Sequence, residues 1–562
     1  MKLLKSSLLG SAAALAAVGA ANAADLPVKK AVPIEYVRIC TAYGAGFFYI
    51  PGTDTCLRVG GRVRAEYGFQ SNENRSVGTQ VGDASTNRAL ARLNVDARTQ
   101  TGYGTLRAFL RIDVSTNSGA FVTSGTRQRI GEAFPGLGID QFSRTQGYVN
   151  ADKAFIQFAG FTAGRVSSFF DFYAHDFEMI AGSAGSDVFS TNVMAYTATL
   201  GNGFSATLSM EDPNYRHNNV FNAASAATAA TVGSSSATVF FNTTAPTPLI
   251  IATDAAGNAT SVIFQDVIER SRLPSFVGVL RYDAAFGSAQ VSAAVKDINI
   301  GAIQGGVGPA AGTGFLGTTP ANPVAALLAR GIRGGPQTDY GYAVQGGIKL
   351  NTPFIAPGDT LYLQGAYGVG AGNYVGTSSY TGQYQVGAPA TNGGPFVQYL
   401  ADAALNPLTG KISLSEAFSV VGAYLHYWTP EWRSAFFASY SQTTFGKNDR
   451  AAISLTQGLV GAAAGSASIA TSPGLFALSP ILRDNYQVYA GASLIWSPVK
   501  DLDIGFEGAY LNTGLLKGRV IDQTRTTGVT AANFNGLLAA GAIKTVNNYD
   551  ATQMRVRVQR DF

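Results

Sequence analysis

Apolar and polar residues alternate along much of this chain. Between Leu57 and Tyr67 the odd-numbered positions are mainly apolar, whereas the even-numbered positions carry three arginines and a glutamate. A period of two places these two sets on opposite faces of a β-strand. The same alternation recurs within residues 91–98, 106–113, 196–210, 342–367 and 486–510. The sequence therefore predicts an all-β protein whose antiparallel strands each have one apolar and one polar face.

The connections between the predicted strands alternate in length. Seven short connections lie near residues 101–104, 159–162, 201–203, 284–288, 351–359, 429–432 and 498–501. Eight long connections lie near residues 70–88, 115–149, 168–190, 212–272, 298–339, 370–415, 443–484 and 512–550. Short periplasmic turns and long outer loops are typical of outer-membrane barrels. We therefore predict a transmembrane antiparallel β-barrel of about sixteen strands, with both chain ends on the periplasmic side.

The composition of the 562 residues agrees with a barrel and excludes several other classes. Charged residues make up 13% of the chain and hydrophobic residues 46%, so the chain is not intrinsically disordered. Two cysteines and three histidines argue against a disulfide-rich scaffold or a zinc protein. Forty basic against 35 acidic residues do not indicate nucleic-acid binding. The histidines lie in no recognised catalytic motif, so we expect neither enzyme activity nor a cofactor nor a bound metal.

The N-terminus has the features of an export signal. Lys2 and Lys5 precede an apolar stretch over residues 8–21, which ends at the small-residue site Ala21-Asn22-Ala23. This pattern predicts a signal peptide over residues 1–23 that is cleaved on export; a buried alanine-rich helix is the alternative. Residues 24–56 lack sustained alternation and are predicted to form a periplasmic segment, followed by the barrel over residues 57–562. No run of 18 apolar residues follows the signal peptide, so the sequence predicts no transmembrane helix after it.

Five stretches and the last residue resemble a known protein family. They are ADLPVKKA (24–31), CTAYGAGFFYIPGTDTCLRVGGRVRAEY (40–67), LNVDARTQTGYGTLRAFLR (93–111), FIQFAGFTAGRVSSFFDFY (155–173) and SPVKDLDIG (497–505), with Phe562 at the end. The chain thus resembles the alphaproteobacterial porins of the rhizobial and brucella type. The resemblance implies a sixteen-stranded barrel, a homotrimer and passive diffusion of small hydrophilic solutes. The chain is longer than usual for the family, and the excess lies in its outer loops.

The resemblance also implies where the pore narrows, because the third outer loop of general porins folds into the barrel. Here that loop spans residues 168–190. Its predicted constriction carboxylates are Asp171, Asp176, Glu178 and Asp187. The predicted basic residues of the pore wall are Arg58, Arg62, Arg64, Arg92, Arg98, Arg107 and Arg111. Carboxylates opposite arginines would create a transverse field that favours polar solutes. The alternative is that these acids only solvate an outer loop.

The sequence also supports predictions about Cys40, Cys56 and Phe562. Cys40 and Cys56 are the only cysteines, and an oxidising periplasm permits a disulfide between them; two reduced thiols are the alternative. Phe562 ends the last predicted strand, and a terminal phenylalanine is the usual signal for the barrel-assembly machinery.

The sequence as a whole predicts a general diffusion porin in the outer membrane of a Gram-negative bacterium. Its expected partners are outer-membrane lipid, lipopolysaccharide, the barrel-assembly machinery, two further copies of the chain and small hydrophilic solutes in transit. One alternative is a substrate-selective channel. Another is a largely capped barrel with an adhesive or structural role at the surface.

Overall fold

The computed structural model describes most of the predicted barrel. The described residues are 38–71, 84–119, 145–172, 185–186, 190–221, 246–257, 259–303, 315–317, 323–377, 385–386, 395–396, 398–463, 473–526, 528–529 and 533–562. The predicted signal peptide and the first part of the predicted periplasmic segment lie outside them. The chain divides into two compact units, Met1–Arg58 and Val59–Phe562.

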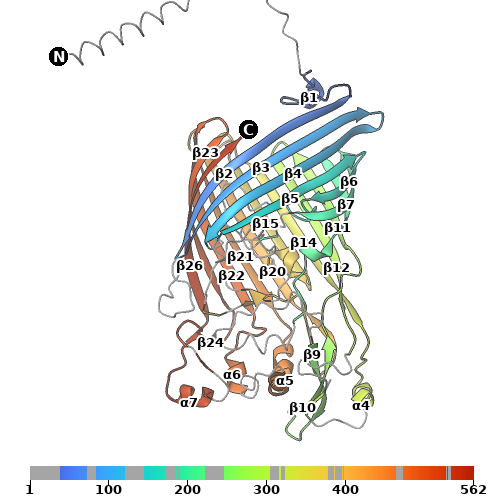
Figure 1. The fold of residues 1–562 in the computed structure, drawn as a ribbon, viewed down its shortest axis with the longest axis vertical. Helices are drawn as coiled ribbons and strands as arrows, with labels where there is room; N and C mark the ends of the chain where they lie inside the picture. The colour runs from blue at the N-terminus through green and yellow to red at the C-terminus, as the bar shows by residue number, and fades with distance from the viewer. Residues whose placement is uncertain are drawn as a thin grey trace, which may run out of the picture. The chain divides into compact units, whose positions relative to one another are not determined.

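Sixteen strands among the described residues form an antiparallel sheet that closes on itself. Each strand pairs with the next along the chain, and the last pairs with the first through Arg62–Gln70 and Gln553–Asp561. The strands are β2 (Thr55–Gln70), β3 (Ala84–Thr101), β4 (Gly104–Gly119), β5 (Thr145–Phe158), β6 (Phe161–Val166), β7 (Thr191–Gly201), β8 (Phe204–Glu211), β11 (Ser275–Ala284), β12 (Gly287–Ile300), β14 (Gln337–Asn351), β15 (Thr360–Val369), β20 (Glu416–Tyr427), β21 (Trp432–Thr444), β22 (Asn485–Val499), β23 (Leu502–Leu515) and β26 (Asn548–Asp561). The predicted barrel and strand number are confirmed (Figure 1).

The alternation in sequence explains which face of each strand points outward. On β26, Met554, Val556 and Val558 are between 43% and 46% exposed, whereas Arg555 and Arg557 are buried. In a membrane barrel the apolar set meets lipid, because an arginine on that face costs about 2–4 kcal/mol at the bilayer midplane. The polar set therefore lines the inside of the barrel.

Tight turns connect the strands at one end of the barrel. Between β7 and β8 the turn residues Gly201, Asn202 and Gly203 all have positive φ angles, of 88°, 51° and 86°. Glycine and asparagine tolerate this region best, and such turns match the twist of a hairpin. A Cβ atom on Gly203 would also lie 2.1 Å from the carbonyl oxygen of Asp283 on the neighbouring strand β11. The short connections predicted from the sequence thus follow from local turn chemistry.

The long connections contain secondary structure that the sequence analysis did not predict. They include β9 (Pro246–Thr253), β10 (Ala259–Asp266), β13 (Phe315–Gly317), β16 (Gln385–Val386), β17 (Gln398–Tyr399), β18 (Ala403–Leu405), β19 (Ile412–Leu414), β24 (Val520–Ile521), β25 (Thr545–Val546), the 3-10 helices η3 (Pro213–Tyr215) and η5 (Gly372–Val375), and the helices α4 (Pro323–Ala329), α5 (Asp449–Ala463), α6 (Pro473–Ala477) and α7 (Phe534–Ala539). Figure 1 shows β9, β10 and the four α-helices beyond one end of the barrel. No helix among the described residues is long and apolar enough to cross a membrane.

These outer elements share hydrophobic cores of their own. In the largest, Leu249, Ile263, Leu327 and Leu405 come from separate segments of three outer loops and are each at most 2% exposed. Burial of such side chains contributes about 1.5–3 kcal/mol each. The outer loops are therefore packed against one another.

The N-terminal unit contains a short folded element closed by a disulfide. It consists of the 3-10 helix η1 (Thr41–Tyr43) and strand β1 (Phe48–Tyr49), which pairs with Cys56 and Leu57 at the start of β2. The disulfide joins Cys40 to Cys56, with their Cα atoms 5.9 Å apart. Both cysteines are buried with Phe47. The disulfide thus closes the loop that carries η1 and β1.

Candidate pore wall and constriction

Six of the seven arginines predicted on the pore wall lie on the inward faces of strands. On β2, Val63 and Tyr67 are exposed outward, whereas Arg64 is 4% exposed. The six are Arg62 and Arg64 on β2, Arg92 and Arg98 on β3, and Arg107 and Arg111 on β4. Arg58 belongs to the N-terminal unit and is exposed. We call the inward face of β2–β5, from Val59 onward, the basic wall.

Except for Arg62, which pairs with Asp561 of β26, the arginines of the basic wall are paired with carboxylates that project from the same wall. Asp96 holds two of them, with its carboxylate oxygens 2.7 Å from Arg98 Nη2 and 2.9 Å from Arg107 Nε. Glu66 likewise lies 3.1 Å from Arg88 and 3.8 Å from Arg64. Each carboxylate therefore serves as a shared partner for two cations.

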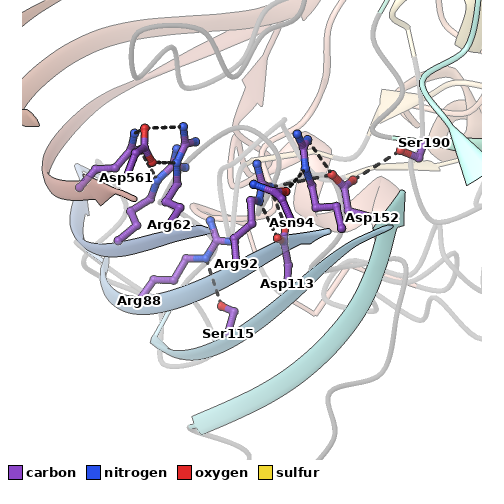
Figure 2. A network of polar contacts seen from close by, with 12 residues as sticks. Arg62, Arg88, Arg92, Asn94, Asp113, Ser115, Asp152, Ser190 and Asp561 are labelled. Carbon is purple, nitrogen blue, oxygen red and sulfur yellow. Dashed lines mark hydrogen bonds and ion pairs between the residues drawn. The ribbon is translucent and has the colours of Figure 1, made fainter. Parts of the chain in front are cut away.

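Two further carboxylates, those of Asp113 and Asp152, form ion pairs with arginines of the basic wall. Arg92 forms a bidentate pair with Asp113, with both N–O distances 2.6 Å. Asp152 lies 3.3 Å from Arg111 and 3.9 Å from Arg92. Figure 2 shows Arg92, Asp113 and Asp152 in one network, and Arg62 beside Asp561 of β26. The sequence analysis did not name the wall carboxylates as site residues, although they stand on the same polar faces as the arginines.

The first residues of the third outer loop are hydrogen-bonded to the side of the barrel opposite the basic wall. After β6, residues 168–172 run along the inner faces of β12 and β14. The carbonyl oxygen of Phe170 accepts hydrogen bonds from Ser292 Oγ and Gln345 Nε2, both 2.8 Å long. Gln290 Nε2 donates to the carbonyl oxygen of Phe169 at 3.2 Å. The predicted inward folding of this loop is confirmed for the described residues.

Two phenylalanines pack the start of the loop onto this wall. Phe170 is 0% exposed, and its ring centroid lies 4.9 Å from that of Tyr374. Phe172 lies against Gly347 of β14, where a Cβ atom would come within 2.3 Å of its ring, and near Tyr362 of β15. The absence of a side chain at Gly347 thus makes room for the loop.

Asp171, the only predicted constriction carboxylate among the described residues, is paired with Arg216. Arg216 Nη2 lies 2.5 Å from Asp171 Oδ2, and Ser186 Oγ donates to Asp171 Oδ1 at 2.7 Å. Burial alone would lower the pKa of Arg216, but Asp171 and Tyr374 raise it above its ordinary value, so Arg216 stays charged. Asp176, Glu178 and Asp187 lie outside the described residues.

The two walls face each other across the barrel. Counting from β2, strand β3 is second and β14 is tenth of the sixteen strands. Strands that are eight positions apart in a ring of sixteen lie on opposite sides. The basic wall is therefore opposite the wall that binds residues 168–172. Sequence reasoning missed Arg216, Gln290, Ser292, Gln345 and Gly347; the strand residues among them do stand at inward positions of alternating strands.

Comparison with known proteins identifies the family. The sequence profile described as "Porin subfamily" matches residues 25–536 of the 562. This chain belongs to the porin subfamily. Within that subfamily it is similar to Porin Omp2b of Brucella suis biovar 1 (strain 1330), with 38% identity over 215 residues, or 37% of this chain and 54% of the relative. Porin Omp2b of Brucella canis (strain ATCC 23365 / NCTC 10854 / RM-666) is also 38% identical over 215 residues, with the same coverage.

These alignments span about half of the length of the curated relatives. A similar solved structure is the outer membrane channel DcaP of Acinetobacter baumannii, with 12% identity, 92% coverage of this chain, 99% coverage of that chain and a TM-score of 0.47. Porin-subfamily membership and the closed barrel locate the protein in the outer membrane of a Gram-negative bacterium. The family points to a channel rather than to an enzyme.

At the end of the barrel, Phe562 continues the pairing of the last strand with the first. Its backbone nitrogen donates to the carbonyl oxygen of Gly61 at 3.1 Å, and Gly61 N donates to the carbonyl oxygen of Phe562 at 2.8 Å. The Phe562 side chain is 68% exposed. The last residue thus takes part in closing the barrel of this porin.

Proposed function

We propose that this porin forms a water-filled channel through which small hydrophilic solutes and ions cross the outer membrane by passive diffusion. The observation that carries the proposal is the basic wall, whose charged side chains line the inside of a closed barrel opposite the anchored third loop. Burial of so many charged groups in a dry interior would cost considerable free energy, and water inside the barrel removes much of that cost. The channel needs no cofactor and performs no chemistry.

The proposal also covers the constriction of the pore, the oligomeric state of the protein and its assembly in the membrane. Asp176, Glu178 and Asp187, which lie outside the described residues, are part of the proposed constriction together with Asp171. The chain assembles as a homotrimer in contact with outer-membrane lipid and lipopolysaccharide, after the barrel-assembly machinery has recognised Phe562. The signal peptide over residues 1–23 is removed on export, and residues 24–56 remain in the periplasm.

Liposome swelling tests this function. Purified protein is folded into liposomes that are then transferred to isotonic solutions of neutral sugars of increasing size. A general diffusion channel gives swelling rates that fall smoothly with solute size and do not saturate with concentration. Saturation by one sugar would instead support a substrate-selective channel. No swelling by protein whose folding is verified by heat modifiability would support a capped barrel.

A further inference from the structure

We propose that the pore prefers anions, and that small organic anions with carboxylate or phosphate groups are the solutes it conducts best. This inference rests on the proposed channel function and names its preferred solute class. It follows from the number, sharing and exposure of the charges on the basic wall.

Basic residues outnumber acidic ones on this wall by two to one. Among the described residues of β2–β5 from Val59 onward, eight are basic and four are acidic. The basic residues are Arg62, Arg64, Arg88, Arg92, Arg98, Arg107, Arg111 and Lys153, and the acidic residues are Glu66, Asp96, Asp113 and Asp152. Asp561 of β26, 2.6 Å from Arg62, matches one of these basic residues, so the wall together with this partner has a formal charge of +3.

The sharing of carboxylates maintains this surplus locally. Asp96 binds Arg98 through Oδ1 and Oδ2 at 3.1 and 2.7 Å, and binds Arg107 in the same way at 2.9 and 3.0 Å. One carboxylate thus fixes two guanidinium groups and leaves a net charge of +1. Glu66 has the same relation to Arg64 and Arg88. The wall therefore carries fixed positive charge at more than one level of the barrel.

Around Asp96 and Asp152 the cations of the wall are also closer to water than the carboxylates, whereas Arg64, Arg88 and Glu66 are all buried. The side chains of Arg98 and Arg107 are each 27% exposed, against 10% for Asp96. Arg111 is 26% exposed, against 8% for its partner Asp152. A solute near Asp96 or Asp152 therefore meets the guanidinium groups of Arg98, Arg107 and Arg111 first. Guanidinium is planar, and its donors match the geometry of carboxylate and phosphate groups.

An aromatic pair lies among these cations. The rings of Phe109 and Phe155 stack with their centroids 5.3 Å apart. The guanidinium of Arg107 lies 5.1 and 5.4 Å from the two ring centroids, and that of Arg111 lies 5.7 Å from Phe109. The rings orient the cations and lower the local dielectric constant, which strengthens their field. Phe155 is buried, but the partly exposed ring of Phe109 also offers apolar surface to the carbon skeleton of an organic anion.

Among the described residues, the acidic side chain at the start of the third loop does not offset this surplus, and the reversal potential measured below includes the charges of Asp176, Glu178 and Asp187. Asp171 is ion-paired with Arg216, which is fully buried on the opposite side of the barrel from the basic wall. The charge of that carboxylate is therefore already matched outside the basic wall.

The test is the reversal potential of the folded full-length porin in planar bilayers with a KCl gradient, at low salt where screening is weak. We expect chloride to be several-fold more permeant than potassium. Arg107→Gln leaves the Arg98–Asp96 pair intact and removes one surplus charge, so we expect the permeability ratio to move toward one. Arg107→Lys should restore it. Arg560→Gln is the matched control, because it removes the same charge from an outward-facing, exposed position of β26 and should leave the ratio unchanged.

The outcomes separate this inference from the proposed function. Ohmic current with a preference for potassium would overturn the inference and leave the diffusion channel standing, and so would equal ratios for Arg107→Gln and Arg560→Gln. If Arg107→Gln does not fold, the sign of the wild-type reversal potential still decides the question. Folded wild-type protein that carries no current would overturn the proposed function and the inference with it. Replacing chloride with acetate, benzoate or phosphate in the same gradient then measures the permeability of each of these anions relative to potassium.

Discussion

A single missing side chain positions the start of the third loop. Gly347 faces inward on β14, and a Cβ atom there would lie 2.3 Å from Phe172 Cδ1. Gly346, the preceding residue, faces outward, and a Cβ atom there would meet nothing within 4 Å. Two adjacent glycines on one strand therefore have different structural roles.

This difference predicts the effect of two alanine substitutions. Gly347→Ala should push Phe172 and the loop away from the wall, at the cost of about 1–3 kcal/mol that is typical of overpacking. Thermal unfolding should shift down, and the single-channel conductance should fall because the loop moves toward the pore axis. Gly346→Ala should behave like the wild type. Equal conductance for the two variants would contradict the contact between Phe172 and the wall.

Alternation in sequence is enough to predict the arginines of the basic wall. An arginine that faces lipid costs free energy, so the polar face of each alternating strand must point into the barrel. The same pattern places Gln290, Ser292 and Gln345 on inward faces, but it does not show that they bind the loop backbone. Arg216 lies in an irregular segment without periodicity. Its burial depends on Asp171, Ser186 and Tyr374, which only the folded chain brings together.

At the scale of elements, the strands were predictable and the structure of the outer loops was not. Each strand is a long alternating segment bounded by turn residues. The outer helices and short strands are stabilised by tertiary contacts between loops, as in the cluster around Leu249 and Ile263. Local signals are weak: β9 and β10 contain the short apolar runs Leu249–Ile251 and Val262–Phe264, but these runs lie within long segments that show no sustained period.

A buried ion pair connects several outer segments to the barrel. Lys296 of β12 is 1% exposed, and its Nζ lies 2.7 Å from Asp402 and 3.3 Å from Glu269. Asp402 also accepts hydrogen bonds from the backbone nitrogens of Asn218 and Gly372, both 2.9 Å long. Removing one partner of such a pair leaves buried charges uncompensated.

We therefore predict that Lys296→Met destabilises the outer loops by about 3–5 kcal/mol. Limited proteolysis of the folded porin should cut within the outer loops much faster than in the wild type, while the barrel itself resists. Lys411→Met, at an exposed loop position, is the control. Unchanged protease resistance in Lys296→Met would show that this cluster does not hold the loops together.

The connection between β14 and β15 contains a carboxylate whose hydrogen bonds predict a pH dependence. Asp359 accepts hydrogen bonds from Tyr424 Oη and His426 Nδ1, both 2.7 Å long, and from Tyr427 N at 2.8 Å. Burial would raise the pKa of Asp359, but the hydrogen bonds from Tyr424, His426 and Tyr427 lower it below its ordinary value of 3.8. The ionised form is thus stabilised by folding.

A lowered folded-state pKa contributes stability above the ordinary value, and this contribution is lost as the pH falls from about 3.8 toward the lower folded-state pKa. Acid unfolding followed by tryptophan fluorescence should therefore be steeper in the wild type than in Asp359→Asn, which should also be less stable at neutral pH. Asp501→Asn, in the exposed turn before β23, should follow the wild type. Identical acid transitions for wild type and Asp359→Asn would contradict this assignment.

At the scale of the whole molecule, one sheet separates two environments. Its outer surface is apolar, its inner surface is charged, and the third loop is held against the wall opposite the arginines. This arrangement accounts for the low charge content of the chain: among the described residues, charged side chains lie mainly in the interior, the turns and the outer loops, and Arg560 on the outer face of β26 is an exception. It also makes ion conduction the property that follows most directly from the fold.

Single-channel recording in planar bilayers is the most direct test of that property. We predict stepwise increases in current as the folded protein inserts, with a linear current–voltage relation and step sizes that reflect insertion of three pores at a time. Folded, heat-modifiable protein that inserts into the bilayer and carries no current would contradict the account of a water-filled pore.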